Sequence, residues 1–275
     1  MGSRVNYVIK NKEKITIYHH RWGAIRISHD LYAGETAFLK YVKECDIHTH
    51  LREDGWMEGF VLVDMEKKLL GFWSWELERE TSVLRYYLSA LQEKWPGWQL
   101  IHLANYMYDA EPLIGFNYIS AQTIPAFKLP DPELMMNDGI PDDCPCALVI
   151  ARQDREIFVA ETMEITVENI ICYGEQSVPL LRRRPAIPLP LEGETRTPDH
   201  IFIDLDNKWL IVNDSIFGIW ETMAHKWPGY TLKMGCIGYL AMLEAANIPT
   251  AGLEMPHSKV MEGFEQMTSL DDLYK

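Results

Sequence analysis

The chain lacks the short motifs that mark many enzyme active sites. Its 275 residues contain no Gly-x-x-x-x-Gly-Lys-Ser/Thr phosphate loop, no Gly-x-Gly-x-x-Gly segment after a strand and no Gly-x-Ser-x-Gly elbow. Such motifs surround a phosphate with backbone amides or hold a nucleophile on a strained turn. Without them the sequence gives no positive sign of an enzyme, so we expect no catalytic residue and no cofactor.

Cysteines are few, and long apolar runs are missing. The five cysteines are an odd number in a long chain, which excludes a disulfide framework and favours a reducing compartment. No apolar run approaches the roughly 18 residues needed to cross a bilayer. Residues 1–6 also lack the apolar core of a signal peptide. We therefore expect a cytoplasmic protein that does not associate with a membrane.

Positive charge is scarce relative to negative charge. There are 26 Lys and Arg residues against 40 Asp and Glu residues, a formal net charge of −14. The arginine triplet at 182–184 is too small and isolated to form a nucleic-acid-binding face. An acidic surface repels nucleic acid and anionic lipid, whereas it attracts a basic protein.

What the sequence does contain is an internal repeat. Trp-Pro-Gly-Trp at residues 95–98 returns as Trp-Pro-Gly-Tyr at residues 227–230. Upstream, the strand-like residues 61–70 match residues 201–210, so that Asp64 corresponds to Asp204. Because internal similarity at a fixed offset indicates repeated structural units, these matches predict a tandem duplication.

A third pair of segments supports the duplication. Residues 5–18 and 147–160 each read as two β-rich runs around a polar tetrapeptide, the pattern of a hairpin, and they align Ile9 with Ile150. We predict a first repeat at residues 5–125 and a second at 147–250. A Pro- and Asp-rich linker at 126–146 joins them, and 251–275 form a C-terminal tail with a short helix.

Periodicity assigns the elements within each half. In the first half we expect helices at 31–42 and 81–94, a loop at 46–58, a hairpin over 59–73 and a strand at 98–103. In the second half we expect strands at 201–204 and 209–212 and helices at 215–226 and 235–247. The predicted fold class is α+β, with each half a mainly antiparallel sheet that has helices packed on one face.

Several residues could carry chemistry, and each has a simpler interpretation. Asp64 and Asp204 could form a carboxylate pair, although an Asp that ends a strand typically caps its own turn. His48-Thr49-His50 and Cys144-Pro145-Cys146 place two metal-binding groups close together, but no further ligands follow at a recognisable spacing. We favour the structural interpretation in each case and expect no metal site.

The repeated pattern of a strand ending in Asp, a helix and Trp-Pro-Gly-Trp or Trp-Pro-Gly-Tyr resembles an uncharacterised family of bacterial proteins. Residues 61–70, 95–98, 201–210 and 227–230 carry this resemblance, together with the segment at 20–23. It covers about a fifth of the chain. The resemblance implies the fold and a loose connection with toxin-immunity proteins, and it brings no catalytic residues.

Three functions remain open from the sequence. The first is a non-enzymatic protein that binds and neutralises a basic bacterial toxin through acidic loops and aromatic anchors. Its predicted partner-binding residues are Trp22, Glu53, Asp54, Trp56, Glu58, Asp138, Asp142 and Asp143. The second is an enzyme or small-ligand-binding protein with a site between the two repeats. The third is a scaffold subunit or homodimer without an activity of its own.

Overall fold

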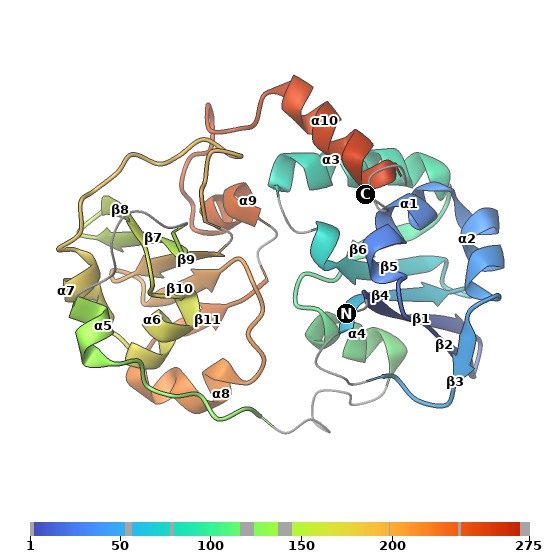
Figure 1. Ribbon diagram of the computed structural model, residues 1–275, viewed down its shortest axis with the longest axis horizontal. Coiled ribbons are helices and arrows are strands. Elements are labelled where there is room, and N and C mark those ends of the chain that lie inside the picture. Colours follow the sequence, from blue (N-terminus) through green and yellow to red (C-terminus); the bar gives the residue numbers. More distant parts are fainter. Residues whose placement is uncertain are drawn as a thin grey trace. The chain divides into compact units, whose positions relative to one another are not determined.

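The chain forms two compact units in the computed structural model. The structure describes residues 3–52, 57–77, 80–115, 124–136, 145–197, 199–235 and 238–269. The first unit comprises residues 1–119 together with 256–275, and the second comprises residues 120–255. Figure 1 shows that each unit is built on its own sheet, with helices beside it. The α+β class and the two similar halves predicted from the sequence are thus confirmed.

The first unit contains a six-stranded mixed sheet in the order β3-β2-β1-β4-β5-β6. Its strands pair antiparallel except at β1–β4 and β5–β6, which are parallel. The strands are β1 (Arg4–Asn11), β2 (Lys14–His20), β3 (Asp46–His48), β4 (Met57–Asp64), β5 (Leu69–Ser74) and β6 (Gln99–His102). The helices are η1 (Ala24–Arg26), α1 (Ile27–Tyr32), α2 (Glu35–Val42), η2 (Trp75–Leu77), α3 (Thr81–Lys94), α4 (Met107–Ile114) and α10 (His257–Thr268).

Helices cover both faces of this sheet, whereas the sequence led us to expect them on one. Phe60 and Leu62 of β4 pack in the same cluster as Ala110 and Ile114 of α4. The alternate residues of β4 are equally buried on the other face, where Figure 1 shows α1 and α3. A strand buried on both faces reads as a continuous apolar run, so its sequence gives no sign of a solvent-facing side.

The second unit repeats this plan with a five-stranded sheet in the order β11-β10-β9-β7-β8. Its strands are β7 (Ala147–Gln153), β8 (Glu156–Thr162), β9 (Asp199–Asp204), β10 (Trp209–Val212) and β11 (Thr231–Lys233). The helices are α5 (Pro132–Met136), α6 (Val167–Tyr173), α7 (Ser177–Leu181), α8 (Ile219–Met223), η4 (Ala224–Lys226) and α9 (Gly238–Ala245). One apolar cluster joins the sheet to α6, α7 and α8, and a second joins its other face to α9.

The backbone of the two units repeats as well as the sequence does. Left-handed conformations recur at matched positions, for example at Lys68 (φ 50°) and Lys208 (φ 58°), and at Gly97 (φ 78°) and Gly229 (φ 79°). The offset of 132 residues extends beyond the Trp-Pro-Gly motif to the ends of α4 and α9, where Gly115 and Asn247 both have positive φ. Left-handed residues of this kind commonly end helices.

The hairpins align one residue differently from the sequence-based match. Lys10 lies opposite Asp64 and Arg152 lies opposite Asp204, so β1 and β7 are 142 residues apart. Ile150 therefore corresponds to Val8, and the match of Ile150 with Ile9 was wrong. A shift of one residue moves a strand's side chains to the opposite face, and alternation cannot detect it when both faces are apolar.

The segments outside the predicted repeats are partly structured. The linker at 126–146 contains α5, whose Met135 is buried in the core of the second unit. The C-terminal segment at 251–275 contains the twelve-residue α10, which packs on α3 and α1 of the first unit. Phe264 of α10 makes edge-to-face contacts with Tyr32 and Tyr86, at ring-centroid distances of 5.4 and 5.0 Å.

Other differences from the predicted elements have local causes. The helix expected at 31–42 is broken into α1 and α2, because Gly34 adopts a positive φ of 89° between them. The loop expected at 46–58 includes the short edge strand β3. The helix expected at 215–226 shortens to α8 and η4, which begin after Gly218 in a left-handed conformation.

Candidate functional site

Two exposed tryptophans lie at one end of the first unit's sheet. His20, Val5, Gly59 and Ser74 form one row across β2, β1, β4 and β5. Trp22 lies two residues after His20, the last residue of β2, and Trp75 lies one residue after Ser74, the last residue of β5. Their side chains are 51% and 56% exposed, in contrast to the buried Trp73 only two residues earlier.

Close backbone packing fixes the segments that carry these tryptophans. A Cβ atom at Gly23 would lie 2.4 Å from Cγ1 of Val5, so only glycine lets the chain after Trp22 lie against β1. The hydroxyl of Ser74, next to Trp75, donates a buried hydrogen bond of 3.0 Å to the carbonyl of Ala24. The backbones on which the two rings are mounted are therefore linked to each other.

Charged side chains accompany the tryptophans. The guanidinium of Arg21 lies 5.7 Å from the centroid of the Trp22 ring. Glu58 precedes Gly59 on β4 and is half-buried, so a predicted partner-binding carboxylate lies at the same end of the sheet. We call Arg21, Trp22, Glu58 and Trp75 the tryptophan surface. Of the other predicted partner-binding residues, Glu53, Asp54, Trp56, Asp138, Asp142 and Asp143 lie outside the described residues.

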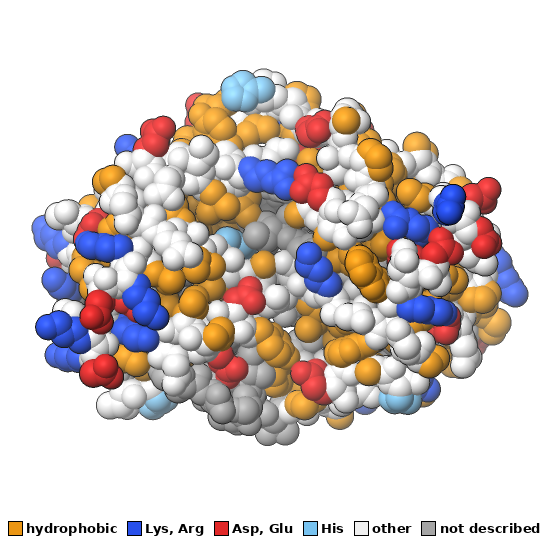
Figure 2. Space-filling model, turned by 180° about the vertical axis from the view of Figure 1, so that it is seen from behind, with side chains coloured by type: hydrophobic (Ala, Val, Ile, Leu, Met, Phe, Trp, Pro, Cys, Tyr) orange, Lys and Arg blue, Asp and Glu red, His pale blue; other side chains and the backbone are white. Residues whose placement is uncertain are grey.

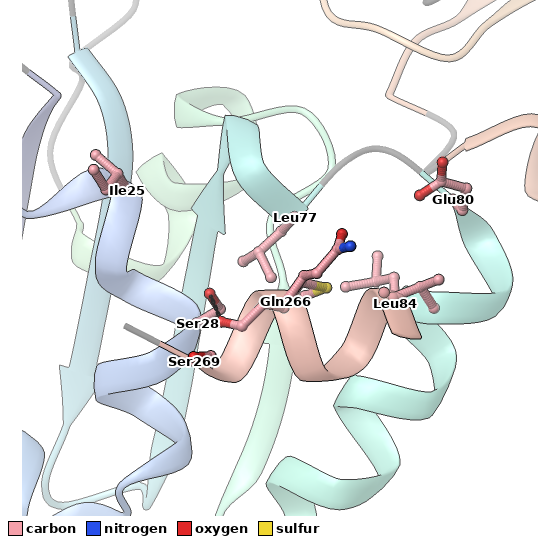
Figure 3. Close-up of a pocket in the computed structure, with 10 residues that line it drawn as sticks. Ile25, Ser28, Leu77, Glu80, Leu84, Gln266 and Ser269 are labelled. Carbon is pink, nitrogen blue, oxygen red and sulfur yellow. Dashed lines mark hydrogen bonds between the residues drawn. The ribbon is translucent and has the colours of Figure 1, made fainter. Parts of the chain in front are cut away.

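A pocket opens beside the tryptophan surface within the same unit. Its volume is about 110 Å³, and Leu77 of η2, two residues after Trp75, forms part of its wall. Figure 3 shows the side chains of Leu77, Leu84 and Gln266 converging on it from η2, α3 and α10. The remaining lining residues are Ile25, Ser28, Glu80, Val83, Gly263, Met267 and Ser269. No sequence pattern predicted this pocket, because α10 is distant from α1 and α3 in the chain.

Asp64 and Asp204 act as turn caps, as the simpler interpretation predicted. Oδ1 of Asp64 accepts hydrogen bonds of 3.2 and 3.0 Å from the amides of Glu66 and Lys67. The same oxygen of Asp204 accepts bonds of 3.0 and 2.9 Å from the two equivalent amides of its turn. Each carboxylate is nearly fully buried in its own unit, so the pair serves the two turns.

The histidines are placed as structural residues. Nε2 of His19 lies 3.1 Å from Arg52, and its ring contacts that of His48 edge-to-face. Burial lowers the pKa of His102 and of His200 to about 4, so both imidazoles are neutral at physiological pH. Among the described residues, no three His, Cys, Asp or Glu side chains come together as a metal site.

The described cysteines are poorly suited to nucleophilic chemistry. Burial raises the pKa of Cys45 and of Cys172 to about 11, which keeps these thiols protonated. Cys146 donates a hydrogen bond of 2.9 Å to the carbonyl of Met163. Cys144 and Cys236 lie outside the described residues, so the Cys144–Cys146 pair is not tested.

A repeated ion-pair cluster escaped the sequence comparison. In the first unit Lys68 pairs with Glu35 at 3.2 Å and lies 4.5 Å above the Trp98 ring. The second unit repeats this arrangement with Lys208, Glu175 and Tyr230, where the ion pair is 2.6 Å long and the cation lies 4.6 Å from the ring. The sequence signal for this cluster is a Gly-Glu pair that occurs at 34–35 and again at 174–175. It was overlooked because it is shorter than the other repeated segments.

The second unit has two acidic residues where the row of the first unit has Gly59 and Ser74. Asp199 and Asp214 occupy the positions equivalent to Gly59 and Ser74, at the same 140-residue offset as the strand repeat. Burial, together with the charge of Asp214, raises the pKa of Asp199 to about 6. The two sheet ends therefore differ in chemistry, although their scaffolds are alike.

Comparison with known proteins adds no further information. No family model matches the chain, and neither a curated protein nor a solved structure does so. Among the described helices, none combines the length and apolar character needed to cross a membrane. The resemblance to toxin-immunity proteins remains a prediction.

Proposed function

We propose that this chain is a non-enzymatic binding protein, and specifically a cytoplasmic immunity protein that binds and neutralises a basic bacterial toxin domain. The observation that carries the proposal is the exposure of Trp22 and Trp75 on anchored backbone at one end of one sheet. Tryptophan is enriched among the residues that dominate binding energy at protein interfaces, because a large rigid ring buries much area at little entropic cost.

Charge supports a basic partner. The net charge of −14 would steer a positively charged protein towards the chain and speed their association. Figure 2 shows acidic side chains interspersed with Lys and Arg on the face that it draws. Local contacts such as those of Glu58 and Arg21 would therefore set the orientation of the complex, while the net charge would act at longer range.

The test is affinity capture from a lysate of the source organism at low and high salt. The bait variants are wild type, the double variant Trp22→Ala/Trp75→Ala and the matched control Trp209→Ala. Trp209 is 44% exposed in the second unit, so the control removes a comparable ring outside the proposed interface. We expect one basic protein in a one-to-one complex, retained more strongly at low salt.

The double variant should weaken that complex by about 30-fold, corresponding to about 2 kcal/mol, and the control should leave it unchanged. Equal capture by wild type and the double variant would remove the tryptophan surface from the proposal. Failure of wild type to retain any protein at either salt concentration would contradict the function itself.

A second candidate function is binding of a small ligand, with or without catalysis. The observation in its favour is the pocket between α1, α3 and α10, which combines apolar walls with Ser28, Glu80 and Gln266. A thermal shift with small uncharged or cationic metabolites, together with a negative capture experiment, would favour this alternative.

A further inference from the structure

We infer that the pocket between α1, α3 and α10 binds the side chain of a lysine from the partner protein. This inference rests on the proposed function, because it assigns a specific anchor to the basic partner. A lysine side chain is a four-carbon apolar stem with an ammonium at its end. The pocket offers matching features along its wall and at its rim.

The size and walls of the pocket suit an alkyl stem. Its volume of about 110 Å³ is somewhat smaller than an apolar cavity of about 150 Å³ that holds benzene. Leu77, Val83, Leu84 and Met267 supply apolar wall. Such a space admits one slender side chain, whereas drug-sized ligands occupy pockets of roughly 300 Å³ or more.

The polar groups of the pocket favour a cation. Glu80 is the ionisable residue among the ten that line it, and Figure 3 shows it at the start of α3. Glu80 already makes another interaction, but its two carboxylate oxygens have about four acceptor sites, so it can accept an ammonium as well. Ser28 already donates its hydroxyl proton to the carbonyl of Met267 at 2.6 Å, which leaves oxygen lone pairs as acceptors. An ammonium has three donors and no acceptor, so it suits this set better than a carboxylate does.

The pocket is already formed in the free chain, so binding of a partner would require little free energy to open it. The bond from Ser28 fixes the end of α10 to α1, and Phe264 fixes its middle to α1 and α3 through Tyr32 and Tyr86. Gly263 permits the close approach of α10, since a Cβ there would lie 2.9 Å from Cγ2 of Val83. Preorganised pockets of this kind bind with a smaller entropic cost.

The tryptophan surface lies next to the pocket, so the two can form one interface. Ile25 belongs to η1, which begins two residues after Trp22, and Leu77 belongs to η2, which begins at Trp75. The η1 and η2 segments are in contact with each other. One continuous partner surface can therefore cover the tryptophans and insert a lysine beside them.

The test uses the isolated full chain with ¹³C-labelled methyl groups, observed by NMR. The probes are Nα-acetyl-lysine methylamide, its Nε-acetylated form, n-butylammonium and n-butyrate. We expect Nα-acetyl-lysine methylamide and n-butylammonium to shift the methyl signals of Leu77, Leu84 and Val83 saturably, with a Kd in the range of about 1–10 mM. The acetylated probe and n-butyrate should bind at least about fivefold more weakly, because they lack the cation.

Two substitutions locate the site. Glu80→Gln should weaken binding of the lysine probe about fivefold, and Gln266→Trp should abolish it by filling the pocket, while the matched variant Gln266→Ala should retain it. A thermal melt of each variant confirms that the fold is retained. Because no toxin is present, failure of the capture experiment does not affect this result.

Three outcomes would overturn the inference. The first is the absence of saturable methyl shifts with the lysine probe. The second is equal binding of the lysine probe and its Nε-acetylated form, which would remove the role of charge. The third is binding of n-butylammonium without binding of the lysine probe, which would identify a site for free amines instead.

Discussion

The two units share a scaffold but differ at its margins. Strand order, turn caps and the buried tryptophans are common to both, whereas β3, α10 and the tryptophan surface belong to the first unit alone among the described residues. β3 pairs with β2 at the edge of the first sheet. At the corresponding edge of the second sheet, along β8, the amide of Ile187 donates one hydrogen bond of 2.9 Å to the carbonyl of Val159. Duplication preserves what the fold requires, so the features found in one copy are the better candidates for function.

The largest expected effect on stability concerns the buried tryptophan that both units share. Trp95 and Trp227 are fully buried, and each Nε1 donates to a main-chain carbonyl, of Leu31 at 2.7 Å and of Ile171 at 2.9 Å. Replacing either by Ala should cost about 3–5 kcal/mol of unfolding free energy, through a large cavity and an unpaired carbonyl. Urea unfolding followed by circular dichroism measures both. A much smaller loss at one site would break the equivalence of the units.

The aspartate turn caps should contribute differently to the stability of the two units. Asp204 pairs with Arg152 at 3.1 Å in addition to capping its turn, and the corresponding Lys10 donates to the carbonyl of Leu113 instead. Asp204→Ala should therefore cost about 3–5 kcal/mol, because it also removes the ion pair of a largely buried guanidinium. Asp64→Ala should cost only about 1–2 kcal/mol, the value of a lost cap. Equal losses in urea unfolding would contradict this difference.

The sheet ends should differ in their response to pH. Because the folded-state pKa of Asp199 is raised from 3.8 to about 6, the folded state holds this proton over a range where the unfolded state has released it. Wild-type stability should therefore fall as pH rises from about 4 to about 6 through this residue. Asp199→Asn should remove that fall and add on the order of 1–2 kcal/mol at pH 7, after allowance for partial exposure.

The pH dependence of unfolding in wild type and Asp199→Asn measures this contribution. The corresponding change in the first unit, Gly59→Asn, would instead force a side chain against Ile27, since a Cβ atom there lies 2.4 Å from its Cδ1. It should destabilise at every pH. A stabilisation by Asp199→Asn that is the same at pH 4 and pH 7 would show that packing, rather than ionisation, distinguishes the two ends.

The sequence was most informative where a repeat or a local signal was strong. Helix α3 was predicted to the residue, because its apolar stripe ends at a Pro-Gly pair. The break between α1 and α2 was missed, although Gly34 lies at it, because the apolar spacing of 31–42 continues across the glycine. The helices on the second face of each sheet were missed because residues 60–63 of β4 and 201–203 of β9 are continuous apolar runs, which do not show a solvent-facing side.

The candidate site was only partly predictable for a physical reason. Trp22 and Glu58 were chosen from the composition of their segments, and both lie at the tryptophan surface. Trp75 was not chosen, since its exposure arises because the chain leaves β5 after Ser74 and turns into η2, whereas Trp73 two residues earlier is buried within the strand. The pocket depends on α10 returning to α1 and α3, and no local pattern encodes a contact across more than 170 residues.

The central claim is that binding resides in the tryptophan surface, which the second unit lacks. The most direct measurement is the affinity of the captured basic partner for wild type, for Trp22→Ala/Trp75→Ala and for Trp209→Ala, by isothermal titration calorimetry at two salt concentrations. We predict a loss of about 30-fold for the double variant, no loss for Trp209→Ala and weaker binding at high salt. An equal loss from Trp209→Ala, or none from the double variant, would contradict the claim.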